Sequence, residues 1–267
     1  MEEQKHSPIL LGGIDNNFTA HTKRVCIFAD NYDFDSIWIE KSEIVVFLQM
    51  EPKQSNRVHE IIPYKHLFDI ILTQQPEIIE QCDNAIAFPY GAQMISKEDE
   101  KIYEKCKLFS IIASTKKEHP GHRLRHEVIS LGNPNLTAYG PEYIDIGYGE
   151  SGMDLGAKII AGKDYAFQVI IENESWENYF TEKLIDCFKT GSIPIYRGCT
   201  NIETYFDTNG MFIVDTLDDI KHLLETLTMD DYNSKLEYVH KNFELSNQYS
   251  NIWSRVDKII DNYISKL

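Results

Sequence analysis

The stretch that decides the fold of this chain runs from residue 165 to residue 214 and reads YAFQVIIENESWENYFTEKLIDCFKTGSIPIYRGCTNIETYFDTNGMFIV. Its apolar start predicts a strand, Glu172 to Lys183 predict a polar loop that enters a helix, and Ile193 to Tyr196 predict a second strand. Polar side chains therefore gather where a strand ends and a helix begins. Open α/β sheets bind their ligands at such places, so this stretch is the first candidate for a binding site.

Short apolar runs recur along the whole chain and alternate with helix-like segments such as Glu77–Cys82. This alternation predicts an α/β fold built from βαβ units with parallel sheets. We expect strands at Val25–Ala29, Ile44–Gln49, Phe68–Thr73, Ala85–Phe88, Leu108–Ala113, Leu136–Tyr139, Phe167–Ile171, Ile193–Tyr196 and Met211–Val214.

The expected strands fall into two series of similar size, which indicates two Rossmann-like domains facing a cleft. We place an N-terminal domain at residues 1–105, a second domain at 106–250 and a C-terminal helix at 251–267. The chain is expected to cross between the domains along Tyr90-Gly91-Ala92 and the charged, helix-like Ser96–Lys107. The last helix is amphipathic, and it either crosses back over the first domain or packs on its own domain.

The composition is that of an ordinary globular protein, with 42% hydrophobic and 25% charged residues in a chain of 267. The net charge of −16 argues against a nucleic-acid partner, because phosphate binding depends on Lys and Arg. No apolar run approaches the roughly 20 residues that span a bilayer. The polar start Met1–Lys5 is unlike a signal peptide, so we expect a cytoplasmic protein without a transmembrane segment.

One basic run stands out against the acidic background, and it comprises Lys116, Lys117, His119, His122, Arg123, Arg125 and His126. It follows the expected strand Leu108–Ala113, so it also lies at the carboxyl end of a strand. Local positive charge can concentrate a small anion even in an acidic protein. A solvated loop is the alternative interpretation, and the pattern fits both equally well.

The helix expected after the polar loop has signals at both ends. Thr181 is a competent N-cap and Gly191 a competent stop. The free N–H groups and the partial positive charge at its start would stabilise a diphosphate together with the Lys183 ammonium. Phosphate would repel Glu182, so we expect this carboxylate to accept hydrogen bonds from sugar hydroxyls such as a ribose diol. The alternative is that Glu182 complements the helix dipole and Lys183 is a surface residue.

Glu172 and Asn173 end the preceding apolar strand, where an ionised side chain is costly unless it is paired. Glu172 either contacts a ligand or bonds loop amides and holds the shape of the site. Tyr179 either packs against the ligand or covers the start of the helix.

The same stretch resembles the donor-binding signature of the family 10 α-1,3/1,4-fucosyltransferases. That signature is an apolar strand ending in Glu-Asn-Ser, then Tyr-x-Thr-Glu-Lys, an apolar helix and Ile/Val-Pro-Ile/Val-Tyr-x-Gly. Glu174 is inserted before Ser175 here, and Arg197 stands where many members carry a bulky aromatic residue. The residues that match, in order and at compatible spacing, are Glu172, Asn173, Tyr179, Thr181, Glu182, Lys183, Pro194, Tyr196 and Gly198.

The resemblance implies a GT-B architecture and an inverting glycosyltransferase that moves fucose from GDP-fucose to a saccharide hydroxyl, without a cofactor. It assigns the first domain to the acceptor and the second to the donor. A phosphate-binding Arg is expected on the helix after the first strand of the donor domain, where Arg125 fits best and Arg123 is the alternative. The donor-binding residues it implies in addition are Glu172, Asn173, Tyr179, Thr181, Glu182 and Lys183.

The resemblance also implies a catalytic base in the first domain, at the end of a strand. Glu51 occupies that place, although the Glu-Ser-Pro triplet common in animal members is missing. An exposed Glu before a proline turn is the alternative interpretation of Glu51.

Two other functions stay open: a transferase of a different nucleotide sugar, and a non-catalytic relative that binds a saccharide or a nucleotide. Asp33-Phe34-Asp35 has the Asp-x-Asp pattern that holds Mn²⁺ in GT-A transferases. A chain with 42 acidic residues produces such triplets by chance, and no second ligand cluster accompanies this one. We therefore expect no metal site.

Overall fold

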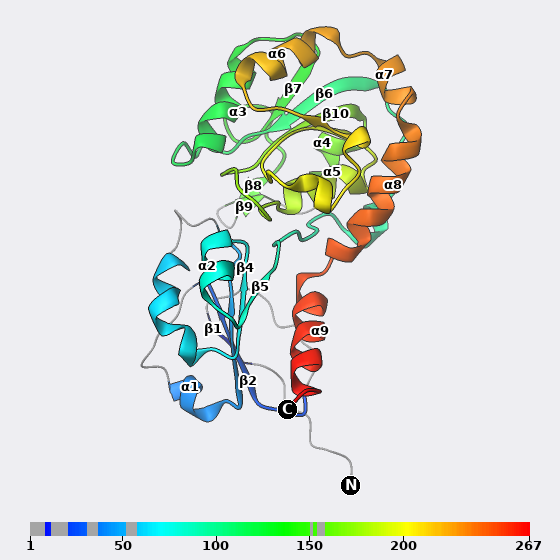
Figure 1. Cartoon of the computed structure of the whole chain (residues 1–267). Coiled ribbons are helices and arrows are strands. Elements are labelled where there is room, and N and C mark those ends of the chain that lie inside the picture. Colours follow the sequence, from blue (N-terminus) through cyan, green and yellow to red (C-terminus); the bar gives the residue numbers. More distant parts are fainter. Residues whose placement is uncertain (1–8, 12–20, 31–36, 52–57, 150–151, 154–157) are drawn as a thin grey trace. The chain divides into compact units, whose positions relative to one another are not determined.

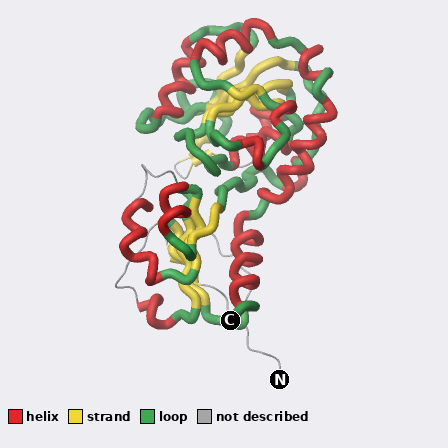
Figure 2. The backbone as a smooth tube through the Cα atoms, in the orientation of Figure 1, coloured by secondary structure: helices red, strands yellow, loops and turns green. Residues whose placement is uncertain are grey.

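The chain divides into two compact units, one formed by Met1–Tyr90 with Asn251–Leu267 and the other by Gly91–Ser250. The computed structural model describes residues 9–11, 21–30, 37–51, 58–149, 152–153 and 158–267. Each unit contains a five-stranded sheet whose neighbouring strands all pair in parallel (Figure 1). Within each unit the helices lie outside the strands (Figure 2). The predicted α/β class with parallel sheets is confirmed.

The sheet of the first unit has its strands in sequence order, β1-β2-β3-β4-β5. They are β1 (Ile9–Leu11), β2 (Val25–Ala29), β3 (Ile44–Leu48), β4 (Ile70–Thr73) and β5 (Ala85–Ala87). Every residue of β2, β3 and β4 is buried, as expected for parallel strands that are covered on both faces. The helical elements of this unit are α1 (Ile37–Lys41), the 3₁₀ helix η2 (Val58–Leu67), α2 (Pro76–Gln81) and α9 (Ile252–Ile264).

The C-terminal helix α9 belongs to the first unit and covers one face of its sheet (Figure 1). Successive residues of a strand point to opposite faces. On one face of the sheet, Phe28 of β2 packs against residues of η2 and α2. On the other face, Val25 and Ile27 pack against Val256 and Ile260 of α9. Without α9 the second face would expose a row of aliphatic side chains, each worth about 1.5–3 kcal/mol when buried. Of the two positions left open for this helix, the one that crosses back is confirmed.

Residues 91–106 belong to the second unit, so the division lies at Tyr90–Gly91 and not at 105–106. The Gly91 N–H donates to the Phe180 carbonyl at 3.0 Å, and the buried Lys105 ammonium donates to the Thr190 carbonyl at 2.7 Å. Within this segment a single 3₁₀ turn, η3 (Lys97–Asp99), is helical, so the helix predicted at Ser96–Lys107 was wrong. Hydrogen bonds to distant parts of the second unit hold the segment extended. No local sequence pattern indicates these bonds.

The sheet of the second unit has the order β12-β11-β10-β6-β7. The first strand, β6, has β7 on one side and β10 on the other, so the strand order reverses between β6 and β10. This point is the topological switch point, where open α/β sheets bind ligands beyond the carboxyl ends of the strands. The strands are β6 (Lys107–Ile112), β7 (Leu136–Tyr139), β10 (Tyr165–Ile171), β11 (Ile193–Arg197) and β12 (Phe212–Ile213), with a separate antiparallel pair β8 (Tyr148–Gly149) and β9 (Gly152–Met153).

Helices cover both faces of this second sheet (Figure 2). Phe167 and Val169 of β10 pack with residues of α3, α6 and α8 on one face, and Ile170 packs with α5 on the other. The helical elements are α3 (Pro120–Ser130), α4 (Lys158–Gly162), α5 (Glu182–Lys189), α6 (Leu217–Thr226), α7 (Met229–Asn233) and α8 (Leu236–Ser246), with 3₁₀ turns η5 (Ile202–Thr204), η6 (Thr208–Gly210) and η7 (Asn247–Tyr249).

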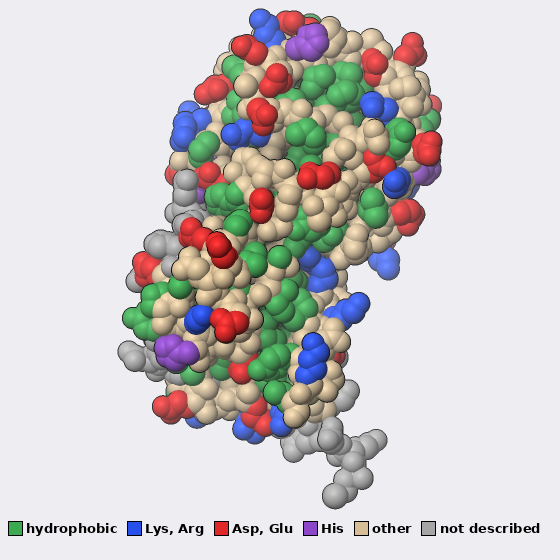
Figure 3. Space-filling view, in the orientation of Figure 1, with side chains coloured by type: hydrophobic (Ala, Val, Ile, Leu, Met, Phe, Trp, Pro, Cys, Tyr) green, Lys and Arg blue, Asp and Glu red, His purple; other side chains and the backbone are tan. Residues whose placement is uncertain are grey.

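Acidic and basic side chains are interspersed with polar and apolar ones over the face drawn in Figure 3. In the part of the chain that the structure describes, no helix has both the length and the apolar character needed to cross a membrane.

Candidate functional site

The end of β10 and the start of α5 are tied together by Glu172. Its carboxylate accepts the Thr181 N–H at 2.8 Å and the Thr181 hydroxyl at 2.7 Å. Thr181 is the N-cap of α5, as predicted, and its hydroxyl also accepts the Lys183 N–H at 3.4 Å. Glu172 is wholly buried. Between its two open interpretations, the geometry favours the one in which Glu172 holds the shape of the site.

The N–H groups of Thr181 and Lys183 therefore bond within the chain. These two N–H groups are therefore not available to a diphosphate, contrary to the expectation of free N–H groups at this helix end. The positive charge that remains for an anion is that of the Lys183 ammonium and the partial charge of the helix. That ammonium donates to the Thr181 hydroxyl at 2.9 Å and lies 3.3 Å from Glu172. The side chain of Lys183 is 26% exposed, so an anion in solution can reach it.

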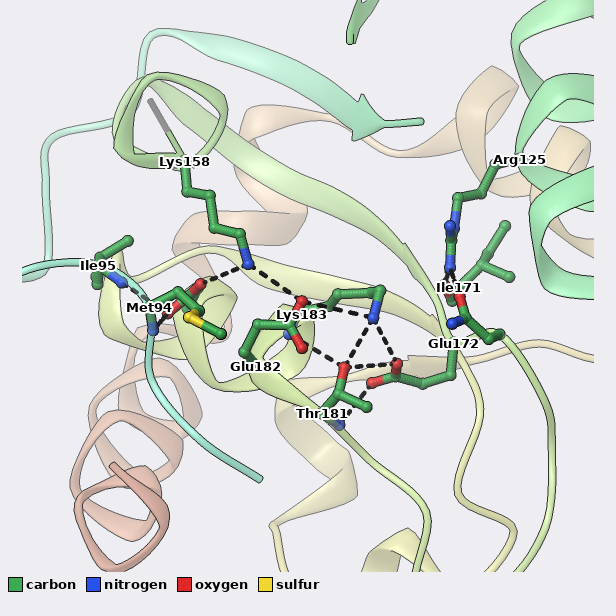
Figure 4. Close-up of polar contacts among 11 residues, drawn as sticks. Met94, Ile95, Arg125, Lys158, Ile171, Glu172, Thr181, Glu182 and Lys183 are labelled. Carbon is green, nitrogen blue, oxygen red and sulfur yellow. Dashed lines mark hydrogen bonds and ion pairs between the residues drawn. The ribbon is translucent and has the colours of Figure 1, made fainter. Parts of the chain in front are cut away.

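Charged side chains of alternating sign continue from Lys183 along α5 and to the start of α4 (Figure 4). The Glu182 carboxylate lies 3.5 Å from the Lys183 ammonium and 3.1 Å from that of Lys158. Lys158 in turn lies 3.3 Å from Asp186, whose other oxygen accepts the Met94 N–H at 2.8 Å. The five charges from Glu172 to Asp186 form one connected network, which we call the α5 charge network: Glu172, Lys183, Glu182, Lys158 and Asp186.

The ionisation of the α5 charge network follows from its pairing. Burial alone would raise the pKa of Glu182, but the ammonium groups of Lys158 and Lys183 outweigh it and hold the pKa well below its ordinary value. Burial would likewise lower the pKa of Lys158, but the carboxylates of Glu182 and Asp186 outweigh it and raise the pKa. Glu182 therefore stays an ionised hydrogen-bond acceptor at neutral pH.

The amino end of α3 lies against the end of β10, across the switch point. The Gly121 N–H donates to the Asn173 carbonyl at 3.1 Å. A Cβ atom at Gly121 would lie 1.8 Å from the Glu172 carbonyl oxygen, so a residue without a side chain is required for this approach. Pro120 precedes it at the start of α3, where its missing N–H costs nothing.

The two arginines of α3 lie in different surroundings. Arg125 is buried, and its guanidinium donates to the Ile171 carbonyl at 2.9 and 2.5 Å and to the Asn173 side-chain oxygen at 2.9 Å. Its positive charge is therefore fixed at the end of β10 (Figure 4). Arg123 is exposed and donates to the carbonyls of Lys117 and Glu118 in the loop before α3. The structure brings Arg125 together with Asn173 and leaves Arg123 outside this group.

The inserted Glu174 has a partner that sequence reasoning missed. Its carboxylate lies 2.7 Å from the His119 ring, and both side chains are buried. His119 lies at the N-cap of α3, so the insertion adds a further contact between the start of α3 and the loop after β10. Tyr179 is also buried, with its ring centroid 5.1 Å from that of Trp176.

Lys158 and Asp186 were missed as well, for different reasons. Asp186 lies four positions after Glu182 on α5, so helical spacing places the two on one face, and this signal was available. Lys158 lies far from Glu182 along the chain, and no local pattern connects them.

Glu51, the expected base, lies in the first unit and is exposed. It follows β3, which ends at Leu48. Its N–H donates to the Asp30 carboxylate at 2.9 Å, and its carbonyl accepts the Gln49 side-chain amide at 3.0 Å. Asp33 and Asp35 lie outside the described residues. Among the residues that are described, no group of three or more His, Cys, Asp and Glu side chains could hold a metal ion.

Acid is expected to weaken the second unit through His122. Burial, reinforced by the positive charge of Arg125, lowers the pKa of this imidazole from 6.5 to about 4. Between these two pKa values the unfolded chain therefore binds more protons than the folded chain. The free energy of unfolding is unaffected by His122 above pH 6.5 and decreases as the pH falls from 6.5 towards 4. We expect a loss of about 2–3 kcal/mol in the free energy of unfolding from this group. Denaturant titrations at both ends of the window should show a smaller loss in His122→Gln, and an equal loss would contradict the prediction.

Comparison with solved structures agrees with this fold. A crystal structure of an α1,3-fucosyltransferase superposes with a TM-score of 0.53 at 14% sequence identity, covering 86% of this chain and 79% of that one. The structure of such an enzyme with GDP-fucose gives 0.53 at 15% identity, covering 84% of this chain and 76% of that one. At this identity the likeness concerns the fold, and the predicted GT-B-like α/β class is confirmed.

The family match covers part of the second unit and the start of α9. Residues 148–257 match glycosyltransferase family 10 (fucosyltransferase) C-term. GDP-fucose protein O-fucosyltransferase 3 of Xenopus tropicalis is 32% identical over 111 residues, which are 38% of this chain and 24% of that protein. The chain thus matches about a quarter of the length of this curated relative. Residues 148–257 are therefore similar to the C-terminal domain of family 10, and the resemblance predicted from the sequence is confirmed.

Proposed function

We propose that this chain is an inverting fucosyltransferase that takes fucose from GDP-fucose and transfers it to a hydroxyl of a saccharide. The observation that carries the proposal is the position of the α5 charge network. It lies within the family 10 segment, at the carboxyl end of β10, next to the switch point of a GT-B-like fold. Structures with GDP-fucose and with GDP are among those that share the fold.

In this proposal the Lys183 ammonium binds the diphosphate of the donor. It is the member of the network with the largest exposed fraction, and the partial positive charge at the start of α5 acts in the same direction. Arg125 adds a fixed positive charge at the end of β10. Arg123 is the weaker candidate for binding the phosphate, because its guanidinium donates to carbonyls of the loop before α3. Glu182 accepts hydrogen bonds from the ribose hydroxyls.

The remaining predicted residues support the donor indirectly. Glu172 and Thr181 hold the start of α5 in place, and the Asn173 side-chain oxygen accepts a hydrogen bond from Arg125. We assign to the buried Tyr179 the role of covering the start of the helix. These four side chains therefore shape the pocket for the nucleotide sugar. Their loss is expected to act through the position of Lys183.

The transfer step requires a base on the acceptor side, and we assign this role to Glu51. The acceptor oxygen attacks the anomeric carbon of fucose while its proton passes to the Glu51 carboxylate. The bond from that carbon to the β-phosphate oxygen breaks, and GDP leaves with its negative charge stabilised by Lys183 and Arg125. Attack from the side opposite the leaving group inverts the anomeric configuration.

A second candidate acceptor is the hydroxyl of a Ser or Thr side chain in a polypeptide. The match to a protein named GDP-fucose protein O-fucosyltransferase 3 favours it. The donor chemistry is the same for both acceptors, because each offers a hydroxyl to the same anomeric carbon.

The experiment that tests the proposal is a calorimetric titration with GDP, GDP-fucose and UDP, with and without a chelator. We expect GDP and GDP-fucose to bind at least about tenfold more tightly than UDP, a difference of about 1.4 kcal/mol, and the chelator to change nothing. GDP release is then measured with a glycan panel and a peptide panel. Tighter binding of UDP would identify another nucleotide sugar, donor binding without transfer would leave a non-catalytic binder, and a requirement for Mn²⁺ would contradict the GT-B site.

A further inference from the structure

Lys158 is the least expected member of the α5 charge network. It is the first residue of α4, and its ammonium lies between the carboxylates of Glu182 and Asp186, at 3.1 and 3.3 Å (Figure 4). The side chain is only 12% exposed. An ammonium is costly to bury unless it is paired, so its position depends on both carboxylates.

Asp186 provides the fixed end of this arrangement. One of its oxygens accepts two backbone N–H groups, from Met94 at 2.8 Å and from Ile95 at 3.2 Å. Its other oxygen contacts Lys158. The backbone of residues 94 and 95 therefore holds Asp186, Asp186 holds Lys158, and Lys158 holds Glu182.

Glu182 would otherwise lack this restraint on the side facing α4. It sits in the first turn of α5, and its side chain is 17% exposed. A long side chain that is free to rotate must lose conformational entropy before it binds a ligand. The oxygen that contacts Lys158 is also the one nearest Lys183. A carboxylate has about four lone-pair positions, so the two ammonium contacts and the contact with the Thr181 side chain leave acceptor capacity for a diol.

We propose that Lys158 is a positioning residue for the nucleotide of the donor, because it fixes the Glu182 carboxylate in the orientation that accepts the two ribose hydroxyls of GDP. This inference rests on the proposed function, since it takes the nucleotide to be a guanosine diphosphate bound at the start of α5. It adds a residue on α4 to the recognition of the ribose. Lys158 itself does not touch the ligand.

The test compares GDP with 2′,3′-dideoxy-GDP, which lacks both hydroxyls, by calorimetry. For the unaltered protein we expect at least about tenfold weaker binding of the dideoxy compound, because it loses both charge-assisted hydrogen bonds to Glu182. In Lys158→Met, GDP affinity should fall by about the same factor while the dideoxy compound binds as before, so the discrimination disappears. Lys158→Arg, which keeps the charge, should retain most of it.

Two controls separate positioning from a general loss of structure. Lys221→Met removes an exposed lysine of α6 in the same unit and should leave both affinities unchanged. The double variant Lys158→Met with Asp186→Asn removes one positive and one negative charge together, so it leaves the net charge intact. It should fold, as judged by thermal unfolding, and should still lose the discrimination.

Four results would overturn the inference. Lys158→Met could weaken both ligands equally, which a merely structural role would do. Lys158→Met and the double variant could keep the full discrimination. The unaltered protein could also bind both compounds with equal affinity, which would remove Glu182 from the ribose while the proposed function stands. If the unaltered protein binds neither compound, the proposed function fails, and this inference fails with it.

Discussion

Glu51→Gln is expected to lower the turnover of GDP-fucose by about 10²–10⁴-fold, the usual contribution of a general base. Gln has nearly the same size as Glu but cannot take the proton of the acceptor hydroxyl. The position of the residue should not change, because its backbone is bonded to Asp30 and Gln49. GDP affinity should also stay the same, since Lys183 and Glu182 lie in the other unit.

The measurement is the initial rate of GDP release at saturating donor and acceptor, together with the affinity for GDP. Glu80→Gln, at an exposed position of α2 in the same unit, is the matched control and should keep the full rate. A Glu51→Gln protein that transfers fucose at the unaltered rate would show that Glu51 is not the base. A loss of GDP affinity in this variant would instead place Glu51 in the donor site.

Glu172→Gln is expected to have the second largest effect, on stability and on donor binding together. The wholly buried carboxylate accepts the N–H and the hydroxyl of Thr181 and lies 3.3 Å from the Lys183 ammonium. An amide can offer only one oxygen to these groups and turns its NH₂ towards another donor. Leaving buried donors without a partner costs about 2–4 kcal/mol in the free energy of unfolding. The start of α5 would loosen, and Lys183 with it.

Urea titrations and GDP calorimetry measure the two parts of this effect. Glu177→Gln lies in the same loop at an exposed position and should change neither quantity by more than a few tenths of a kcal/mol. If Glu172→Gln kept its stability but lost GDP affinity, Glu172 would be a ligand of the donor. Unchanged values for both would contradict the role of Glu172 in holding Thr181.

The strands were largely predictable because their pattern is local. Val25–Ala29 and Ile44–Leu48 are continuous apolar runs, and such runs are typical of parallel strands with both faces covered. Thr181 was predictable as the start of α5 because an N-cap is defined by neighbours within one turn. The short strand Ile9–Leu11 was missed, since three apolar residues beside a glycine pair carry little periodic signal.

The segment Ser96–Lys107 at the start of the second unit was not predictable in the same way. Ser96–Lys107 has the charged composition of an exposed helix, yet it is held extended by bonds from Lys101 to Lys189 and from Lys105 to Thr190. These partners lie far along the chain. Tertiary contacts override a local preference that is worth only a few tenths of a kcal/mol per residue.

The sequence by itself determined the α/β class, the start of α5 and the family signature from Glu172 to Lys183, because each depends on neighbouring residues or on a spacing along one strand or helix. Only the tertiary structure decided that the Glu172 carboxylate accepts hydrogen bonds from Thr181 and that Arg125 rather than Arg123 lies at the end of β10. The ion pair between Lys158 and Glu182 was likewise decided by the tertiary structure. Each of these joins side chains from different elements. The order of the strands brings those elements together, and a linear pattern does not contain that order.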